Sequence, residues 1–553
     1  MTRLGPDLRD RAYRWLADDP DPDSKLELQR VLASAMGGSA EAVDELADRL
    51  SGPLTFGTAG LRGPVRAGPN GMNRAVVIRT TAGLAAWLTA GGHGGGVVVV
   101  GRDARHGSEP FCADTAGVLA AAGFDVRVLP RPLPTPVLAF AVRSLGAVAG
   151  VQITASHNPP ADNGYKLYLD AGTQLVPPAD REIEAAIAAA PAAVSVPRSA
   201  DWTTLGDEVL ESYLDRAAAL PRGTARRLRV AATALHGVGA GPLALALDRA
   251  GFVDVSVVAE QARPDPDFPT VGFPNPEEPG ATDLLLAKAA EVGADLAIAL
   301  DPDADRCAIG VPTPDGWRML TGDETGVLLG SHVLATLPAA ARAADPLVAT
   351  TIVSSSQLAS IAAAHGARHD ATLTGFKWLV RAGDGHGTGL VFAYEEALGL
   401  CVDPDTVRDK DGISAAVLAC DLTATLRAAG RTPLDALDDL AVAHGVHLTR
   451  QLSVRVTDLN RIAELMASLR ATPPTAFAGT PVTAEDLRPR ADVLRYTGPG
   501  TRVIVRPSGT EPKIKAYLEV VAPVPAPDAL SEARASATRT LDALAAEVSA
   551  LLA

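Results

Sequence analysis

Short runs of β-branched residues alternate with longer stretches rich in alanine and leucine along most of the chain. Val97–Val100 follows a glycine-rich turn, a helical stretch covers Thr115–Ala122, and Val126–Leu129 comes next. Similar runs recur at Leu228–Ala232, Val253–Val258, Leu296–Leu300, Leu347–Val353 and Leu390–Ala393. Strand–helix–strand alternation predicts parallel sheets that are covered by helices. The loops that carry function are then expected at the carboxyl ends of the strands.

Chain length and changes in composition indicate several domains. The 553 residues correspond to roughly three or four domains, each with its own core. Domain boundaries are predicted at Ala188–Asp201, read as a helix end with a connector, at the turn-rich Thr313–Gly322 and near His444. The tail from Leu448 onward differs in pattern and predicts a smaller α+β domain. Its expected elements are strands at Gln451–Val456, Val503–Val505 and Ile514–Leu518 and a terminal helix from Pro527.

The acidic charge balance excludes several classes of partner. With 50 basic and 65 acidic residues, the formal net charge is −15. General nucleic-acid binding needs a basic surface, and so does a polybasic membrane patch. Four scattered cysteines without a CxxC motif argue against a disulfide scaffold or a zinc ribbon. Because the first 32 residues hold no apolar signal core and no run of 18 apolar residues occurs, we expect a cytoplasmic protein.

A polar loop, Thr154–Pro160, follows the apolar segment Gly150–Ile153. Its Asn-Pro-Pro sequence enforces a rigid, extended turn, which presents Ser156 on a stiff loop. The loop lacks the GxSxG pattern, so a hydrolase-type serine nucleophile is disfavoured. We expect His157, as the next residue in the chain, to point away from the Ser156 hydroxyl. A purely structural turn explains this loop equally well.

Three aspartates at alternate positions, Asp301, Asp303 and Asp305, follow the predicted strand Leu296–Leu300. Carboxylates on one short loop repel one another unless a cation lies between them. The EF-hand pattern fails, because Arg306 stands where that loop requires glycine. Hard oxygen ligands with few protein donors favour Mg²⁺ that is shared with a phosphate. The alternative, a solvated acidic turn, fits less well directly after an apolar strand.

A locally basic loop, Arg506–Lys515, lies between two predicted strands of the tail. Ser508, Gly509 and Thr510 offer hydroxyl and backbone N–H donors, and the Arg506 guanidinium offers a planar fork. Together these groups predict an anion-binding nest. The alternative is an ordinary polar hairpin, but the basic sign against an acidic background favours a phosphate site.

Two further segments accompany these motifs. Glu395 and Glu396 end a predicted strand, where they could accept hydrogen bonds from sugar hydroxyls; the alternative is a charge pair at a helix N-terminus. Thr55–Gly63 is a glycine-rich loop that carries one arginine, Arg62. It is not a Walker A loop, because GxxxxGK[ST] occurs nowhere in the chain.

These motifs, in this order, resemble those of the α-D-phosphohexomutase superfamily. The resemblance rests on four motifs between Thr55 and Lys515 and covers nearly the whole chain. It is closest to the branch that contains phosphoglucomutase 2 and phosphopentomutase. The fuller motifs that point to this branch are Thr55–Gly63, Asn163–Lys166, Thr374–Trp378 and Tyr394–Gly399.

The resemblance implies a particular α/β fold. Three related α/β domains with mixed sheets and a smaller α+β C-terminal domain would form a heart-shaped molecule around a central cleft. Each domain would supply one loop to the cleft. The implied domains are residues 1–205 with the phosphoserine loop, 206–321 with the metal-binding loop, 322–446 with the sugar-binding loop and 447–553 with the phosphate-binding loop.

The resemblance also implies an isomerase-class activity. A phosphoglucomutase interconverts glucose 1-phosphate and glucose 6-phosphate through a phosphoserine, with glucose 1,6-bisphosphate as intermediate and activator; phosphomannomutase activity is a further possibility. The implied Mg²⁺ site comprises Ser156 with its phosphate and Asp301, Asp303 and Asp305. The implied substrate and phosphate contacts are Arg306, Glu395, Glu396, Arg506, Ser508, Gly509, Thr510 and Lys515.

Acid–base roles follow from the same resemblance. The positions of Arg62, His157, Lys166 and Lys377 match those near the reacting oxygens, and Lys166 is our first choice, because a desolvated, cation-rich site lowers a lysine pKa. Taken alone, Lys166 could equally be a surface lysine. Leu398 stands where much of the superfamily has a serine, which puts one sugar contact in doubt.

The sequence leaves the substrate and the oligomeric state open. A phosphopentomutase acting on ribose or deoxyribose 1-phosphate is the nearest alternative, and a metal-dependent phosphatase or phosphosugar-binding protein is a more distant one. We expect a phosphosugar as the partner, no nucleic acid and no membrane, and either a monomer or a homodimer.

Overall fold

The computed structural model describes residues 4–56, 60–169, 172–456, 459–508 and 513–552. The chain divides into two compact units. The first unit holds the chain up to Pro221 together with Arg226–Arg318 and Asp403–Cys420. The second holds Arg222–Ala225, Met319–Val402 and the chain from Asp421 onward.

Three helices precede the first sheet. They are α1 (Pro6–Asp18), α2 (Pro22–Met36) and α3 (Ala40–Arg49). Proline in the first turn of α1 and α2 removes an N–H that would have no helical partner, and the Ser39 side chain caps α3 by accepting from the Ala42 N–H. Leu28 and Leu46 are fully buried in the small core of these helices.

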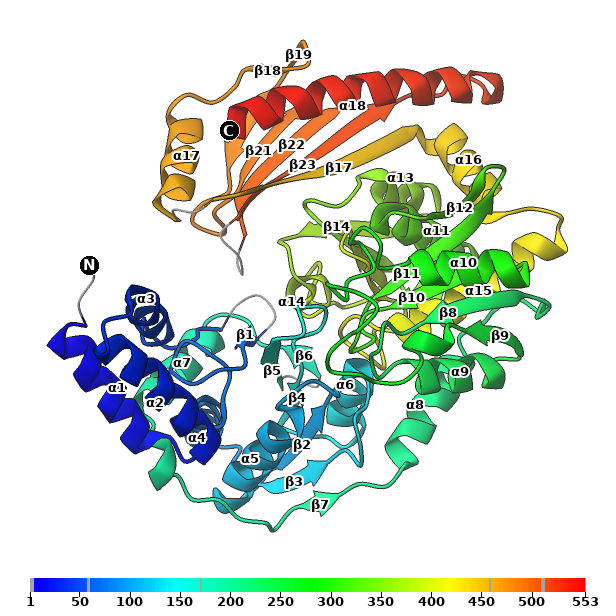
Figure 1. The fold of residues 1–553 in the computed structure, drawn as a ribbon. Helices are drawn as coiled ribbons and strands as arrows, with labels where there is room; N and C mark the ends of the chain where they lie inside the picture. The colour runs from blue at the N-terminus through cyan, green and yellow to red at the C-terminus, as the bar shows by residue number, and fades with distance from the viewer. Residues whose placement is uncertain (1–3, 57–59, 170–171, 457–458, 509–512, 553) are drawn as a thin grey trace. The chain divides into compact units, whose positions relative to one another are not determined.

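The first unit is built around a mixed sheet in the order β1-β5-β4-β2-β3-β7, with β6 paired to β5. The neighbours of β5 run antiparallel to it, whereas β4, β2, β3 and β7 are parallel. Helices α5 and α6 pack against β2, whose valine run is buried (Figure 1). The strands are β1 (Leu61–Pro64), β2 (Val97–Arg102), β3 (Asp125–Val128), β4 (Ala149–Ile153), β5 (Asp162–Leu169), β6 (Thr173–Gln174) and β7 (Thr203–Thr204). The helices are α4 (Arg74–Ala90), α5 (Ser108–Ala121), α6 (Thr135–Ser144), α7 (Ala179–Ala189) and the 3-10 turn η1 (Ala193–Ser195).

A second sheet of this unit has the order β12-β11-β10-β8-β9. Strands β9, β8 and β10 are parallel, and β11 is antiparallel to β10. The predicted boundary segment Thr313–Gly322 holds the hairpin turn between β11 and β12 and the start of α11, and the two units divide within it, between Arg318 and Met319. The elements are β8 (Arg229–Thr233), β9 (Asp254–Val257), β10 (Leu296–Leu300), β11 (Cys307–Thr313), β12 (Gly316–Met319), α8 (Glu208–Ala218), α9 (Ala240–Arg249), η2 (Ala259–Gln261) and α10 (Asp283–Val292).

The second unit contains a sheet in the order β14-β13-β15-β16. Strand β13 is parallel to β14 and β15, and β16 is antiparallel to β15. Helix α11 begins with a capping box between Thr321 and Glu324. The elements are β13 (Leu347–Thr351), β14 (Arg368–Thr372), β15 (Leu390–Glu395), β16 (Gly399–Cys401), α11 (Gly322–Thr336), α12 (Ala339–Ala343), α13 (Gln357–Ala364), α14 (Phe376–Leu379) and α16 (Pro433–His444). Helix α15 (Gly412–Ala428) belongs to the first unit up to Cys420 and to the second unit from Asp421.

The C-terminal part of this unit is an antiparallel sheet in the order β17-β23-β22-β21-β20. The long helix α18 packs across β17 and β23 (Figure 1), so the predicted smaller α+β arrangement is confirmed. The elements are β17 (Val446–Arg455), α17 (Leu459–Ala471), β18 (Ala476–Phe477), β19 (Thr480–Pro481), β20 (Thr483–Asp486), β21 (Leu494–Gly498), β22 (Thr501–Pro507), β23 (Lys513–Ala522), η3 (Pro527–Ala529) and α18 (Leu530–Leu552).

Within the described ranges, no single helix has both the length and the apolar composition to cross a membrane. Helices α15 and α16, which meet at a bend of 89°, reach that length and composition only when taken together.

Candidate active site

The Ser156 loop connects β4 to β5 in the first unit, as the sequence predicts. Ser156 has a φ of 53°, a left-handed conformation that non-glycine residues rarely adopt. Its N–H donates to the Thr154 hydroxyl oxygen at 2.9 Å. The residue is only 1% exposed, so its hydroxyl is presented by a tightly held, desolvated loop.

The expectation that His157 points away from Ser156 is wrong. His157 Nδ1 lies 3.1 Å from Ser156 Oγ. The left-handed backbone at Ser156 turns the chain so that the two adjacent side chains meet. Burial, and the nearby Arg306 and Arg62 cations, hold the pKa of His157 well below its usual value, which favours a neutral imidazole beside the hydroxyl.

The three predicted aspartates lie on the loop that follows β10, and all of them are fully buried. Their carboxylate oxygens lie within 4.8 Å of one another. Ser156 Oγ donates to Asp301 Oδ2 at 2.7 Å, so the loop after β4 and the loop after β10 meet at this atom. The alternative of a solvated acidic turn is therefore wrong.

Two lysines balance the charge of this acidic loop. Lys166 Nζ donates to Asp303 Oδ2 at 2.5 Å and to Asp305 Oδ2 at 2.7 Å, and Lys410 Nζ lies 3.2 Å from Asp305 Oδ2. The Lys166 side chain is 1% exposed, so the surface-lysine alternative is wrong.

The protonation of the three carboxyls differs. Burial raises the pKa of Asp303 and Asp305, but the Lys166 ammonium outweighs it and holds both pKa values below their usual range. Burial and the two neighbouring carboxylates raise the pKa of Asp301 well above its usual value. Asp301, which accepts the hydrogen bond from the Ser156 hydroxyl, is thus the aspartate whose ionisation costs the most free energy when no cation is bound.

The free oxygens of this loop fit a divalent cation. Asp303 Oδ1 and Asp305 Oδ1 are buried and accept no hydrogen bond from the described residues. Buried polar oxygens without a partner are costly, and carboxylate oxygens are the ligands that Mg²⁺ prefers. Few protein ligands together with a phosphate are the usual arrangement for Mg²⁺, and Ser156 Oγ stands beside the cluster.

Two predicted arginines lie around the same cluster. Arg62 is on β1, which pairs with the β5 strand that carries Lys166, and its NH1 donates to Asn158 Oδ1 at 3.2 Å. The Arg306 N–H donates to Asp301 Oδ1 at 3.0 Å, and Arg306 Nε lies 3.9 Å from Asp305 Oδ1. The structure therefore brings the predicted residues of the first unit to one place.

Glu395 and Glu396 lie in the second unit, at the turn from β15 to β16. The helix N-terminus alternative is wrong, because this turn joins two strands. The hydroxyls of Thr351, the last residue of β13, and of Ser354, which follows that strand, each donate to Glu396 Oε2 at 3.1 Å. The Glu396 carboxylate is thus oriented by the turn of the neighbouring strand.

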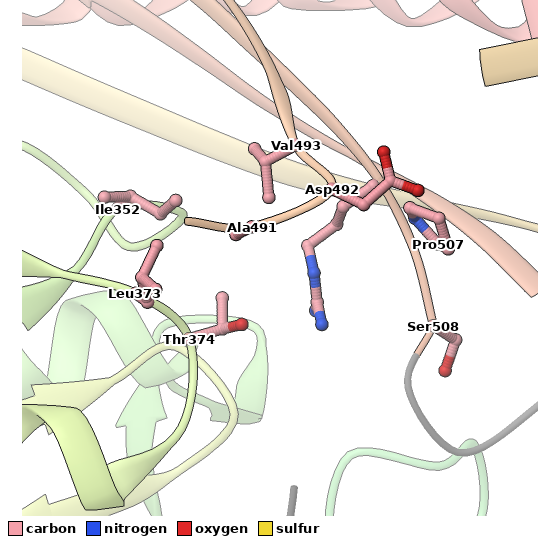
Figure 2. Close-up of a pocket in the computed structure, with 9 residues that line it drawn as sticks. Ile352, Leu373, Thr374, Ala491, Asp492, Val493, Pro507 and Ser508 are labelled. Carbon is pink, nitrogen blue, oxygen red and sulfur yellow. The ribbon is translucent and has the colours of Figure 1, made fainter. Parts of the chain in front are cut away.

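The predicted phosphate loop of this unit leaves the end of β22 and returns into β23. Arg506 lines a cavity of about 260 Å³, in which Thr374 lies on one side and Pro507 and Ser508 on another (Figure 2). Gly509 and Thr510 lie outside the described residues. The remaining cavity residues are Ile352, Leu373, Ala491, Asp492 and Val493.

The two other cations predicted for this unit lie on different elements. Lys377 is on α14 with its ammonium 5.9 Å from the Trp378 ring centroid, and Lys515 is on β23 opposite Arg506 in the strand register.

Three residues of the first-unit cluster are absent from the sequence prediction. Thr135 Oγ1 donates to Asp303 Oδ2 at 2.5 Å, Lys410 pairs with Asp305, and Arg105 binds the backbone of the Ser156 loop. Arg105 follows the carboxyl end of β2, the position at which function was expected, and this signal could have found it. Thr135 and Lys410 reach the site only through tertiary packing, and no local pattern marks them.

Four family models match the chain in order. Their descriptions are phosphoglucomutase/phosphomannomutase alpha/beta/alpha domain I over residues 53–193, domain II over 211–315, domain III over 321–442 and the C-terminal domain over 452–535.

Individual proteins give the same picture. A "Probable phosphomannomutase" of Haemophilus influenzae is 44% identical over 81% of this chain and 93% of its own length. A mouse phosphopentomutase is 32% identical over 94% of this chain and 92% of its own. A crystal structure of a phosphoglucomutase/phosphomannomutase family protein from Burkholderia thailandensis has a TM-score of 0.66 at 22% identity, covering 88% of this chain and 97% of that one; this likeness concerns the fold.

Proposed function

Since the chain belongs to the phosphoglucomutase/phosphomannomutase family, we propose that this phosphosugar mutase interconverts glucose 1-phosphate and glucose 6-phosphate. The observation that carries the proposal is the contact of Ser156 Oγ with Asp301 Oδ2 at 2.7 Å. It joins a serine on a strained, buried loop to a cluster of three buried carboxylates. Such a serine is suited to carry a phosphoryl group in a site from which water is excluded.

The proposed reaction has two phosphoryl transfers. Phosphoserine 156 gives its phosphoryl group to O6 of glucose 1-phosphate, O6 loses its proton to a base, Ser156 Oγ takes up a proton, and glucose 1,6-bisphosphate forms. The bisphosphate then turns over, Ser156 Oγ gives up its proton as it takes the O1 phosphoryl group, O1 takes up a proton, and glucose 6-phosphate leaves. Ser156 ends as it began, so the enzyme is regenerated without a net co-reactant.

Proton handling is assigned from the contacts of each residue. His157 Nδ1 touches Ser156 Oγ, whereas Lys166 donates to two carboxylates. We therefore assign to His157 the transfer of the proton at Ser156 Oγ. To Lys166 we assign the neutralisation of the negative charge of the acidic loop. Arg62 and Lys377 are assigned to contacts with the reacting oxygens of the substrate.

The proposed metal ligands are Asp301, Asp303, Asp305 and the phosphate on Ser156. Mg²⁺ bound there would offset the negative charge of the phosphoryl group during transfer. Arg306, which binds Asp301 through its backbone N–H, keeps the loop in shape and brings a second positive charge to the phosphate.

The proposed substrate contacts come from the second unit. Glu395 and Glu396 accept hydrogen bonds from sugar hydroxyls. Arg506, Ser508 and Lys515, with Gly509 and Thr510, bind the phosphate that is not reacting. The orientation of Glu396 by Thr351 and Ser354 supports this role, because a fixed carboxylate discriminates between hydroxyl positions better than a mobile one.

A second candidate is a phosphopentomutase. The mouse relative with that name, at 32% identity over 94% of this chain, favours it. Leu398 also favours it, because a buried leucine in place of a serine removes one hydrogen-bonding group near the sugar. The H. influenzae relative, which is more similar, favours a hexose.

Product formation from glucose 1-phosphate, mannose 1-phosphate and ribose 1-phosphate tests the proposal, each with Mg²⁺ and a trace of the matching bisphosphate. We expect the highest kcat/KM for glucose 1-phosphate. Fastest conversion of ribose 1-phosphate would favour the second candidate, and release of inorganic phosphate without isomerisation would contradict both.

A further inference from the structure

Arg105 follows the carboxyl end of β2, within the first unit, and its side chain is 1% exposed. Its guanidinium binds the Ser156 loop through four backbone carbonyl oxygens. NH2 donates to Ser156 O at 2.6 Å and to Asn158 O at 2.7 Å. NH1 donates to Pro159 O at 2.8 Å and to Asp162 O at 3.1 Å. One side chain thus holds the loop from the serine itself to the start of β5.

The rest of the guanidinium also lies against protein groups. Arg105 Nε lies 3.4 Å from Asp103 Oδ2, and Asp103 is itself fixed by the hydroxyl of Ser108 at 2.6 Å. The ring of Phe268, from the loop before α10, covers the guanidinium with its centroid 4.9 Å from Cζ. A guanidinium has five N–H donors. The four on NH1 and NH2 bind loop carbonyls, and Nε is buried beside Asp103 without a hydrogen bond to any described residue, so no donor is exposed to a substrate.

The backbone that Arg105 holds is an uncommon one. Ser156 has a left-handed φ, and that conformation places its Oγ against both Asp301 and His157. A non-glycine residue keeps such a conformation only when its surroundings over-determine it. The loop also has local hydrogen bonds, such as Ser156 N–H to Thr154 Oγ1 and Asn158 N–H to the Ala155 carbonyl. None of these holds the carbonyl of Ser156, which the Arg105 fork binds.

We propose that Arg105 is a positioning residue that fixes Ser156 Oγ for phosphoryl transfer without touching the substrate. This inference rests on the proposed function. A planar fork with fixed geometry can hold four carbonyls at once, whereas a lysine ammonium offers three donors from one point. Loss of the fork should let the loop relax, with Ser156 Oγ displaced from Asp301.

The experiment compares Arg105→Ala and Arg105→Lys with wild type. The matched control is Arg74→Ala in the same unit, because Arg74 forms a two-point contact with the buried Asp114 carboxylate, at 2.7 and 2.9 Å, and does not bind the loop. The readouts are kcat and KM, the rate at which glucose 1,6-bisphosphate phosphorylates Ser156, rescue of Arg105→Ala by guanidinium ion, and amide hydrogen exchange over residues 154–162.

We expect kcat of Arg105→Ala to fall about 100-fold, the loss that a displacement of about 1 Å produces, with KM unchanged and with partial recovery on adding guanidinium. Phosphorylation of Ser156 should slow in parallel, and the amides of Ser156, Asn158 and Asp162 should exchange faster. Arg105→Lys should be intermediate. Arg74→Ala should lose stability alone.

Three results would overturn the proposal: a loss of kcat no greater than in Arg74→Ala, a rise in KM with kcat unchanged, or loop exchange equal to wild type. If Arg105→Ala does not fold, Arg105→Lys decides by the same criteria. If wild type converts no phosphosugar, the proposed function fails, and the exchange measurement then decides the role of Arg105 on its own.

Discussion

At the scale of single residues, the buried acidic loop depends on its counter-ions. Replacing Lys166 by methionine would leave the carboxylates of Asp303 and Asp305 buried without their main cation, and loss of one partner of a buried pair costs about 3–5 kcal/mol. We therefore expect Lys166→Met to lower the free energy of unfolding by about that amount. Mg²⁺ should raise the unfolding temperature of the variant more than that of wild type, because it would supply the missing positive charge.

Lys288→Met is the control for this prediction. Lys288 forms an exposed pair with Glu291 at 2.8 Å, and exposed pairs contribute roughly 0–1 kcal/mol. Chemical denaturation of both variants, with and without Mg²⁺, makes the comparison. Equal losses for Lys166→Met and Lys288→Met would contradict the account of the acidic loop.

Single residues also show how far the sequence predicts the site. The spacing of Asp301, Asp303 and Asp305 after an apolar strand predicts a buried loop that needs a cation, because this pattern is local. The contact between Ser156 and His157 could not be predicted, because it depends on the backbone conformation of Ser156. Arg105 binds that backbone from about 50 residues away in the chain, and no local rule encodes such a contact.

At the scale of secondary-structure elements, the turn that carries Glu396 packs against the first residue of α11. A Cβ on Gly322 would overlap the carbonyl oxygen of Glu396. Gly322→Ala should therefore displace the turn, lower kcat/KM and destabilise the unit by about 1–3 kcal/mol, the usual cost of overpacking.

The control for this change is Gly241→Ala on α9, where an added Cβ meets nothing within 4 Å. Alanine is a better helix former than glycine by up to about 1 kcal/mol, so this variant should be neutral or slightly stabilised. Steady-state kinetics and thermal unfolding test both variants. Normal kcat/KM in Gly322→Ala would contradict a role of this turn in substrate binding.

The C-terminal sheet contains a buried acidic group that should give a pH dependence. Burial opposes ionisation of Glu519, but the hydrogen bond from His447 and the charge of Arg502 lower its pKa to about 2. Because the pKa is lower in the folded state, the stabilisation is complete above the ordinary value of 4.5 and is lost as pH falls toward about 2. Burial raises the pKa of the nearby Asp323 carboxyl, so protonation of Asp323 as pH falls offsets part of this loss of stability.

Unfolding of Glu519→Gln and wild type at several pH values tests this element. At pH 7 the variant should be clearly less stable, because Arg502 and His447 lose their charged partner. The difference should shrink steadily below about pH 4.5. A difference that stays constant down to pH 3 would show that the Glu519 charge contributes nothing to the stability of the sheet.

At the scale of the whole molecule, the alternation of strand and helix predicts most of the fold. The predicted strand Leu296–Leu300 matches β10 at both ends, and the runs from Val97 and Leu347 match β2 and β13 with shifts at their ends. The antiparallel hairpin of β11 and the edge strand β12 was harder to predict, because turn residues occur in hairpins and in connectors alike. The bounds of the four predicted domains stay a prediction.

Distant parts of the chain also combine in ways that the sequence does not indicate. Asp403–Cys420 packs with the first unit, where Lys410 pairs with Asp305, although its neighbours in sequence belong to the second unit. Such pairings are set by tertiary contacts, which a sequence pattern does not show. The sequence therefore predicts each domain as one continuous stretch.

The central claim is that Ser156 carries the phosphoryl group. The most direct test is to incubate the protein with glucose 1,6-bisphosphate and Mg²⁺ and to locate the bound phosphate by peptide mass spectrometry. We expect one phosphate on Ser156 in wild type, its transfer to added glucose 1-phosphate, and neither label nor turnover in Ser156→Ala. Phosphate on another residue, or near-normal mutase turnover in Ser156→Ala, would contradict the account.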